Sequence, residues 1–334
     1  HATFPRFQHW RSDLSLGKQG PMATRNRRTL VLESLEGRVV LSRPASLTLA
    51  ALGDSYTAEY AVNPTGNDGA RNWVEILSAT GRASFGSRYS PVALNAPNPD
   101  FPYDRAVLGA TTTDVLRTQL PAVLPAVASG SVKSVCLFAG INDFGAVVLN
   151  LVEHPESAPA DLSSQVDEAL ATAQSNLDRI VMTLFQANPQ VKLAVATIPL
   201  VPSLPLMVQA LNRPGGQALA TDLNTAILTY NNHIRNLSYL YPSVALVDVA
   251  STFQANLAPP GASAYVASSG PSLTDVFQVD GLHPNTIPQG WIANDFLSAL
   301  STQTGIKTST ISSRQINQYA HVALWRQKQG MPLP

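Results

Sequence analysis

Short, continuous hydrophobic runs recur along this 334-residue chain from residue 47 onward. Each run has the length of a strand, and its apolar residues are nearly continuous rather than alternating with polar ones. This pattern is typical of strands that are buried on both faces of a parallel sheet. It predicts strands at residues 47–52, 105–108, 132–139, 191–198 and 244–249.

Amphipathic helical patterns separate these predicted strands. The clearest covers residues 161–185, where apolar residues recur at spacings of three and four before Asn188–Pro189 ends the pattern. Strands that alternate with helices predict βαβ units with right-handed crossovers. We therefore expect an α/β fold, a three-layer α/β/α sandwich with a mostly parallel central sheet of about five strands. Further helices are expected from Thr112 onward, at 218–240 and at 288–301.

Three segments differ from this alternating pattern. Residues 1–45 carry a net charge of +5 and have little periodicity, so we expect a flexible basic tail outside the fold. Residues 251–281 are rich in small residues and also lack periodicity, which is typical of a functional or mobile loop. Residues 303–334 form a C-terminal segment with one possible helix at 311–328, whose apolar residues are expected to pack on the body.

Composition excludes several classes of protein. The chain has 22 basic and 22 acidic residues, so no broad nucleic-acid-binding surface is expected. Its one cysteine, Cys136, excludes an internal disulfide and a cysteine-based zinc site. No apolar stretch reaches the roughly 18 residues of a transmembrane helix. Metalloprotease, phosphate-loop and dinucleotide-binding motifs are absent from the sequence, so neither a metal nor another cofactor is expected.

The location of the protein in the cell is suggested only by the basic tail. Residues 32–42 resemble a short motif near the start of many exported bacterial proteins, although Ser34 replaces the usual proline. This motif favours a secreted or cell-envelope protein. A cytoplasmic protein with a solvated basic tail is the alternative, and the oligomeric state is left open.

Polar residues follow two of the predicted strands and end the long loop. Ligands bind at the carboxyl ends of the strands in an open parallel sheet. Ser55 follows the first strand in a Gly-Asp-Ser turn and would need a base to act as a nucleophile. Asn142 follows the strand at 132–139 and carries an amide that can donate to an oxyanion. Taken alone, each of these is an ordinary turn.

His283 is the candidate base, because histidine is the usual proton acceptor near neutral pH. Asp280 stands three residues earlier and can hold the imidazole in the required tautomer. Pro284 biases His283 toward an extended backbone. None of the other five histidines has both of these neighbours.

Gly109 precedes a capped helix. Its N–H could donate to an anion, or the residue could simply connect a strand to a helix.

In combination, these four segments resemble the sequence blocks of the SGNH/GDSL hydrolase family of esterases and lipases. The resemblance covers residues 46–302, which makes this stretch the expected catalytic domain. It implies a cofactor-independent mechanism with Ser55 as the nucleophile, His283 as the base and Asp280 as the orienting acid. The oxyanion hole it implies consists of Ser55, Gly109 and Asn142.

Two positions depart from the family pattern. Tyr56 replaces the usual leucine after the serine, and Asp104 or Arg105 stands where the second block often has asparagine. The second departure lies in the same block as Gly109, the proposed backbone donor.

Alternative functions stay open beside this one. An α/β-hydrolase would need a Gly-x-Ser-x-Gly turn in mid-chain, which Gly53-Asp-Ser55-Tyr-Thr57 does not provide. A non-catalytic envelope module could bind a glycan or a partner on the same fold. Within the enzyme class, the substrate is a small-molecule, lipid or glycan ester. The apolar stretch at 200–207 suggests either an acyl pocket or a loop packed under the sheet, and a carbohydrate O-acetylesterase remains a candidate.

Overall fold

The computed structural model describes residues 47–60, 69–86, 101–153, 159–257 and 276–328. The basic tail at 1–45 lies outside the described residues, as does most of the predicted long loop at 251–281.

A parallel five-stranded sheet forms the centre of the described structure, in the order β2-β1-β3-β4-β5. Neighbouring strands are paired in parallel throughout, and Gly53 at the end of β1 lies level with Phe138 at the end of β3. The predicted α/β class is confirmed. The strands are β1 (Leu47–Gly53), β2 (Ala83–Ser84), β3 (Ser134–Phe138), β4 (Lys192–Ala196) and β5 (Val244–Val247).

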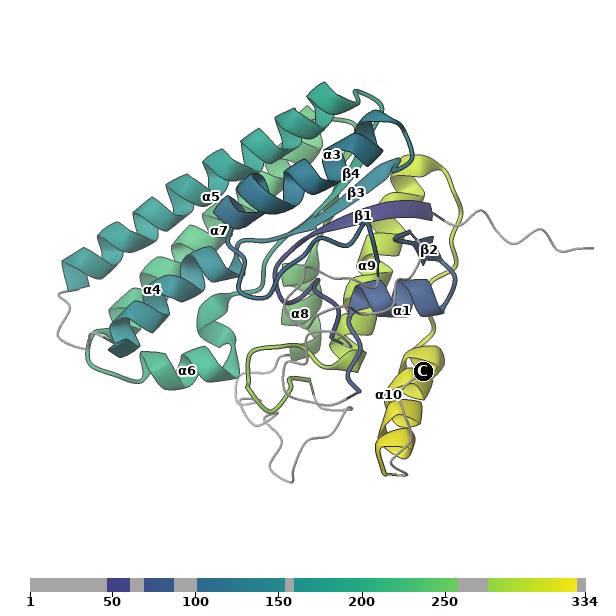
Figure 1. The fold of residues 1–334 in the computed structure, drawn as a ribbon. Coiled ribbons are helices and arrows are strands. Elements are labelled where there is room, and N and C mark those ends of the chain that lie inside the picture. Colours follow the sequence, from purple (N-terminus) through teal and green to yellow (C-terminus); the bar gives the residue numbers. More distant parts are fainter. Residues whose placement is uncertain (1–46, 61–68, 87–100, 154–158, 258–275, 329–334) are drawn as a thin grey trace, which may run out of the picture. The chain divides into compact units, whose positions relative to one another are not determined.

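Helices cover both faces of the sheet (Figure 1). One face carries α3 (Leu120–Ala128), α5 (Pro159–Ala187) and α7 (Gly216–Leu240), with α4 (Ile141–Glu153) beside α5 and α6 (Pro205–Leu211) beside α4. The opposite face carries α1 (Trp73–Ala79), α8 (Val249–Leu257) and α9 (Thr286–Thr304). These layers form the α/β/α sandwich that the strand and helix pattern predicts. The short elements are α2 (Thr112–Asp114), the π-helix η1 (Val115–Gln119) and the 3₁₀-helix η2 (Val201–Ser203).

The core lies between the sheet and each helical layer. The three central strands are almost completely buried, which explains their nearly continuous apolar sequences. On the α1–α9 face, Trp73 stacks on Phe296 with ring centroids 4.1 Å apart. Among the described helices, none combines the length and apolar character that crossing a membrane requires.

The expected strand at 105–108 is wrong. Only one bridge forms there, between Asp104 and Ala51, after which the chain turns and the N–H of Ala110 bonds to the carbonyl of Val107. A short apolar run in a loop has the same sequence appearance as a strand, although Val107 and Leu108 are exposed here. The outer strand beside β1 is instead β2, which is too short to produce a recognisable pattern.

The structure also bears on three other predictions, for the loop at 251–281, the C-terminal helix and the stretch at 200–207. The first seven residues of the predicted loop at 251–281 belong to α8. The possible C-terminal helix is present as α10 (Ser313–Lys328). It packs on α9 through Ile316, whose side chain fills the space where Gly290 has no Cβ atom. In the apolar stretch at 200–207, residues 201–203 form η2 and residues 205–207 begin α6.

Candidate active site

The chain reverses sharply at the end of β1, where Ser55 lies. Gly53 has a φ of 157°, and a Cβ atom at this position would lie 2.1 Å from the carbonyl oxygen of Phe138. Only glycine therefore lets β1 end this close to β3. The N–H of Asp54 donates to the same carbonyl over 3.3 Å, and the N–H groups of Thr57 and Ala58 bond back to the carbonyl of Asp54. This turn places Ser55 at the carboxyl edge of the sheet, with 6% of its surface exposed.

Gln119, which is not among the residues predicted for the site, holds this turn through two hydrogen bonds to Gly53. Its Oε1 accepts from the N–H of Gly53 over 2.8 Å, and its Nε2 donates to the carbonyl of Gly53 over 2.8 Å. The residue lies at the end of the π-helix η1 and is buried. A signal was available, because Gln119 occupies the same four-residue stripe as the core residues Val115, Val123 and Val127.

Asp54 is a buried carboxyl group beside Ser55. Its Oδ1 accepts from the N–H of Tyr56 over 2.9 Å, whereas Oδ2 has no hydrogen-bond partner among the described residues. Burial raises the pKa of Asp54 to about 7, against the effect of the Tyr56 bond, and the nearby charge of Asp143 adds to the increase. Asp54 is therefore largely protonated below neutral pH.

His283 lies in a tight antiparallel turn before α9. The N–H of Gln278 donates to the carbonyl of His283 over 2.8 Å, and the N–H of Asn285 donates to the carbonyl of Val276 over 2.9 Å. Gly281 closes the turn with a φ of 66°, in the left-handed region that favours glycine. These contacts fix the backbone from which the imidazole projects.

Asp280 lies in contact with His283. Its Oδ2 lies 2.5 Å from Nδ1 of His283, and its Oδ1 accepts from the N–H groups of Leu282 and His283 over 2.9 and 3.0 Å. Burial alone would favour the neutral acid, but these hydrogen bonds and the attraction of the imidazole hold the pKa of Asp280 below its ordinary value. An ionised Asp280 favours the tautomer of a neighbouring imidazole that has its proton on Nδ1.

The turn after β1 and the His283 turn lie against each other. The hydroxyl of Tyr56 donates to the carbonyl of Leu282 over 2.7 Å, and its ring centroid lies 6.2 Å from that of His283. The side chain next to Ser55 therefore touches the His283 turn. Within the described residues, no hydrogen bond joins the Ser55 hydroxyl to the imidazole of His283. Such bonds are often long in ligand-free enzymes.

Asn142 and the Gly109 loop also lie together. The side-chain amide of Asn142 donates to the carbonyl of Ala110 over 3.0 Å. Because an amide nitrogen carries two hydrogens, one remains available for another acceptor. Asp143 anchors the same loop, since it accepts from the N–H and the hydroxyl of Thr112 over 2.9 and 2.7 Å. Gly109 itself is exposed and has a φ of 73°.

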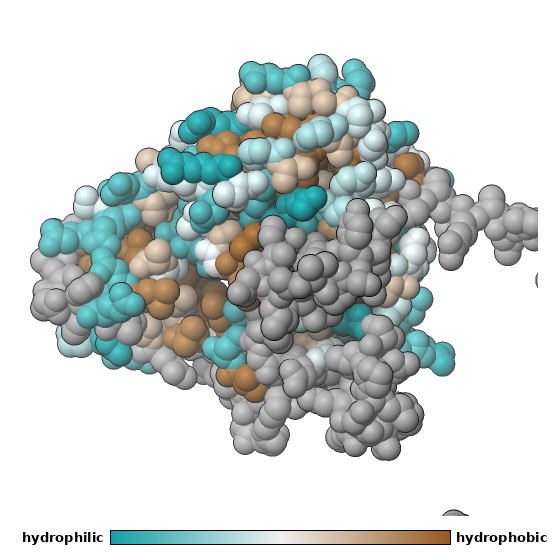
Figure 2. All heavy atoms as spheres, in the orientation of Figure 1, coloured by the Kyte–Doolittle hydropathy of each residue, from teal (hydrophilic) through white to brown (hydrophobic). Residues whose placement is uncertain are grey.

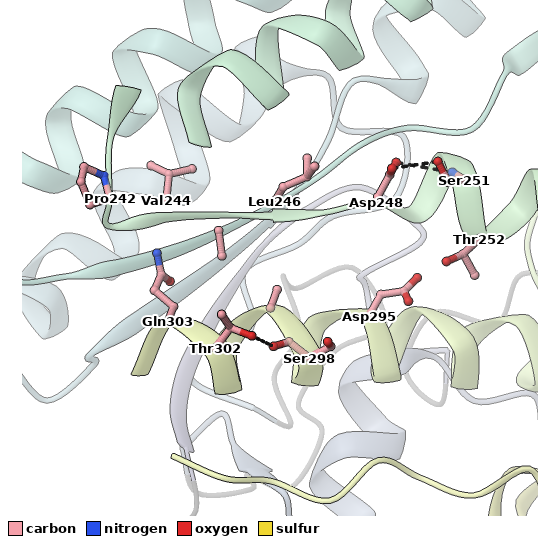
Figure 3. Close-up of a pocket in the computed structure, with 12 residues that line it drawn as sticks. Pro242, Val244, Leu246, Asp248, Ser251, Thr252, Asp295, Ser298, Thr302 and Gln303 are labelled. Atoms are coloured by element: carbon pink, nitrogen blue, oxygen red, sulfur yellow. Dashed lines mark hydrogen bonds between the residues drawn. The ribbon is translucent and has the colours of Figure 1, made fainter. Parts of the chain in front are cut away.

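A cavity of about 660 Å³ lies elsewhere, between β5 and α9 (Figure 3). None of the predicted site residues lines it. Within it, Ser251 donates to Asp248 over 2.8 Å, while burial raises the pKa of Asp295 to about 6. No group of three or more His, Cys, Asp or Glu residues in the described ranges is arranged to hold a metal ion.

Comparisons with solved structures give matches of low sequence identity. The lipase Lip_vut3 from a goat rumen metagenome is 14% identical over 76% of this chain and 97% of its own, with a TM-score of 0.48. Phospholipase A1 from Streptomyces albidoflavus is 19% identical over 78% of this chain and 100% of its own, with a TM-score of 0.45. A family 3 carbohydrate esterase from Clostridium thermocellum is 15% identical over 79% and 100%, with a TM-score of 0.42.

Comparison with protein-family models gives a match over most of the chain. No curated protein matches the chain. The model of the GDSL-like Lipase/Acylhydrolase family matches residues 51–287, which is more than two thirds of the chain. The match includes the Ser55 turn, the Gly109 loop, Asn142 and the His283 turn. The chain therefore belongs to the GDSL-like lipase/acylhydrolase family of hydrolases.

Proposed function

We propose that this protein is a serine esterase that hydrolyses carboxylic esters, with Ser55 as the nucleophile, His283 as the base and Asp280 as the orienting acid. The observation that carries the proposal is the 2.5 Å contact between Asp280 and His283, on a turn that touches the residue after Ser55. An aspartate on Nδ1 selects the tautomer that a general base needs. Residues 46–302 are proposed as the catalytic domain.

The reaction proceeds through an acyl-enzyme. Ser55 Oγ attacks the ester carbonyl carbon while Nε2 of His283 takes the hydroxyl proton. The tetrahedral intermediate collapses when His283 returns this proton to the leaving alcohol, and the ester C–O bond breaks. Water then attacks the acyl-Ser55, gives its proton to His283 and releases the carboxylic acid, while the serine regains its proton.

The oxyanion is proposed to bind three donors, the N–H groups of Ser55 and Gly109 and the amide of Asn142. The bond from Asn142 to Ala110 supports this assignment, because it ties the amide to the loop that contains Gly109. One such donor contributes about 2.7–4 kcal/mol to transition-state stabilisation.

Exposed apolar residues around the site favour an acyl group with an apolar chain. Leu108 precedes Gly109, and Val279 precedes Asp280, with 40% and 46% of their surfaces exposed. Leu206 is also exposed, and its N–H bonds to the carbonyl of Gly281 in the His283 turn over 3.0 Å. Apolar residues are also visible over α4 and α6 in Figure 2. Large exposed apolar residues at three places beside one site suit an alkyl chain better than a sugar.

The test is hydrolysis of p-nitrophenyl esters from acetyl to palmitoyl. Ser55→Ala should lower kcat by several orders of magnitude, whereas Ser129→Ala, an exposed serine on another part of the fold, should not. A preference for medium or long chains supports the acyl-ester assignment. A preference for acetyl supports a carbohydrate O-acetylesterase, and acetylated glycans would then be assayed.

A fluorophosphonate probe tests the nucleophile without knowledge of the substrate. It should label wild-type protein at Ser55 and leave Ser55→Ala unlabelled. If neither esters nor the probe react with the wild type, the esterase proposal is wrong, and a non-catalytic binding module is the better description.

A further inference from the structure

We propose that Tyr56 and Tyr60 are positioning residues that hold the backbone on both sides of His283. This inference rests on the proposed function and deepens it. The hydroxyl of Tyr56 donates to the carbonyl of Leu282 over 2.7 Å, and the hydroxyl of Tyr60 donates to the carbonyl of Pro284 over 3.2 Å. These two carbonyls belong to the residues immediately before and after His283.

The two bonds act on carbonyl groups, whereas Asp280 contacts N–H groups and the imidazole ring. Asp280 contacts the imidazole ring through Nδ1 and accepts from the backbone N–H of His283. The tyrosines instead hold the carbonyl of the peptide group before His283 and the carbonyl of Pro284, one peptide group further along, so they fix the course of the backbone through His283. Both tyrosines come from the segment that follows Ser55, so the distance between base and nucleophile depends on them directly.

Both tyrosines are themselves held in place. Gln289 on α9 donates to the hydroxyl of Tyr60 over 2.7 Å and to the carbonyl of Tyr56 over 3.2 Å, while its Oε1 accepts from the N–H of Trp73 over 3.1 Å. Tyr56 also contacts the ring of Phe138 edge-on, at 5.7 Å between centroids. At least 96% of the surface of each tyrosine is buried, so little water competes for the two carbonyls.

Tyr56 also explains the departure from the family pattern at this position. A leucine would fill much of the same apolar space, but it has no donor for the carbonyl of Leu282. The Tyr56 hydroxyl is therefore a feature that this chain adds to the site, and its removal by phenylalanine keeps the ring.

The first test measures the tautomer of His283 in protein labelled with ¹⁵N-histidine. His283→Gln assigns the signals of His283, because it removes them from the spectrum. Tyr56→Phe and Tyr60→Phe should each increase the fraction of His283 with its proton on Nε2, since the Asp280 contact loosens when the turn moves. Tyr230→Phe is the matched control, because it removes a buried hydroxyl bond to another carbonyl, that of Ala139 over 3.1 Å.

The second test measures how fast Ser55 reacts. Tyr56→Phe should lower kcat by about ten- to a hundredfold with little change in KM, because a displaced base affects the reaction more than substrate binding. The rate of fluorophosphonate labelling should fall by a similar factor. Tm is recorded for every variant and compared with that of Tyr230→Phe.

The outcomes separate this inference from the proposed function. If Tyr56→Phe and Tyr60→Phe lower Tm as Tyr230→Phe does, but leave the tautomer and labelling rate unchanged, the tyrosines only pack the core and the inference is wrong. If the probe fails to label wild-type Ser55, the esterase proposal fails. The tautomer measurement still decides in that case whether the tyrosines position His283.

Discussion

Gln119 and Gly53 exchange two hydrogen bonds, each 2.8 Å long, at the point where β1 gives way to the Ser55 turn. A side-chain amide thus bonds to both the N–H and the carbonyl of the last residue of β1. Gln119 is the last residue of the π-helix η1, and its amide reaches the backbone of Gly53 from there.

Gln119→Leu should destabilise the protein and slow the reaction. The N–H of Gly53 loses its partner, while the carbonyl keeps the N–H of Val107 at 3.2 Å. One buried donor left without a partner costs about 1–3 kcal/mol. Urea unfolding measures this loss, and Gln190→Leu, at an exposed position, serves as the control. Equal stability of the two variants would show that the amide is dispensable.

Gly53→Ala should be far more damaging than Gly130→Ala. Both glycines have positive φ, but a Cβ atom at Gly130 would have open space around it, whereas at Gly53 it would lie 2.1 Å from Phe138 O. Gly130→Ala should therefore cost only the backbone strain of about 1–2 kcal/mol. Gly53→Ala should prevent folding or lower Tm much further in thermal unfolding. Similar Tm values for both variants would contradict the close approach of β1 and β3.

Asp54→Asn should change how stability depends on pH. The folded pKa of about 7 lies above the ordinary value of 3.8, so the folded state holds this proton more tightly than the unfolded state. The contribution of Asp54 to stability is therefore complete below pH 3.8 and is lost as the pH rises through about 7.

The asparagine variant removes this loss, because it stays neutral and its Oδ1 can still accept from Tyr56. Relative to wild type, it should gain up to about 4 kcal/mol between pH 4 and pH 8. Urea unfolding across this range measures the difference. Asp295→Asn is the comparison, because the contribution of Asp295 to stability should be lost as the pH rises through about 6. A parallel pH dependence of wild type and Asp54→Asn would rule out the raised pKa.

Asp280→Asn should lower kcat by about 10⁴, because an amide on Nδ1 stabilises the wrong tautomer of the base. The chain contains a matched control in Asp178, which contacts Nε2 of His233 over 2.8 Å on the surface of α5 and α7. Asp178→Asn removes an aspartate–histidine contact without touching the site and should keep the esterase rate. Equal rates for both variants in the p-nitrophenyl ester assay would remove Asp280 from the mechanism.

The sequence predicts the fold class and the candidate residues because both depend on local patterns. The buried runs that became β1, β3, β4 and β5 are long enough to recognise, and the Asp280–His283 spacing is short enough to imply contact. The strand β2 and the loop at 105–108 could not be predicted correctly, since a two-residue strand leaves no periodic signal and a short apolar loop resembles a strand. The roles of Gln119, Tyr60 and Gln289 depend on contacts between distant segments, which no local pattern records.

The bond from Tyr56 to Leu282 joins residues 226 positions apart in the sequence. During synthesis, the segment with Ser55 leaves the ribosome long before the segment with His283 exists. The nascent chain is therefore expected to have no esterase activity until nearly all of the domain has emerged. Contacts of such long range also make folding slow, because the connecting chain must be ordered before they form. With Ser55 and His283 in their proposed roles, activity is expected to appear only late in the folding of the domain.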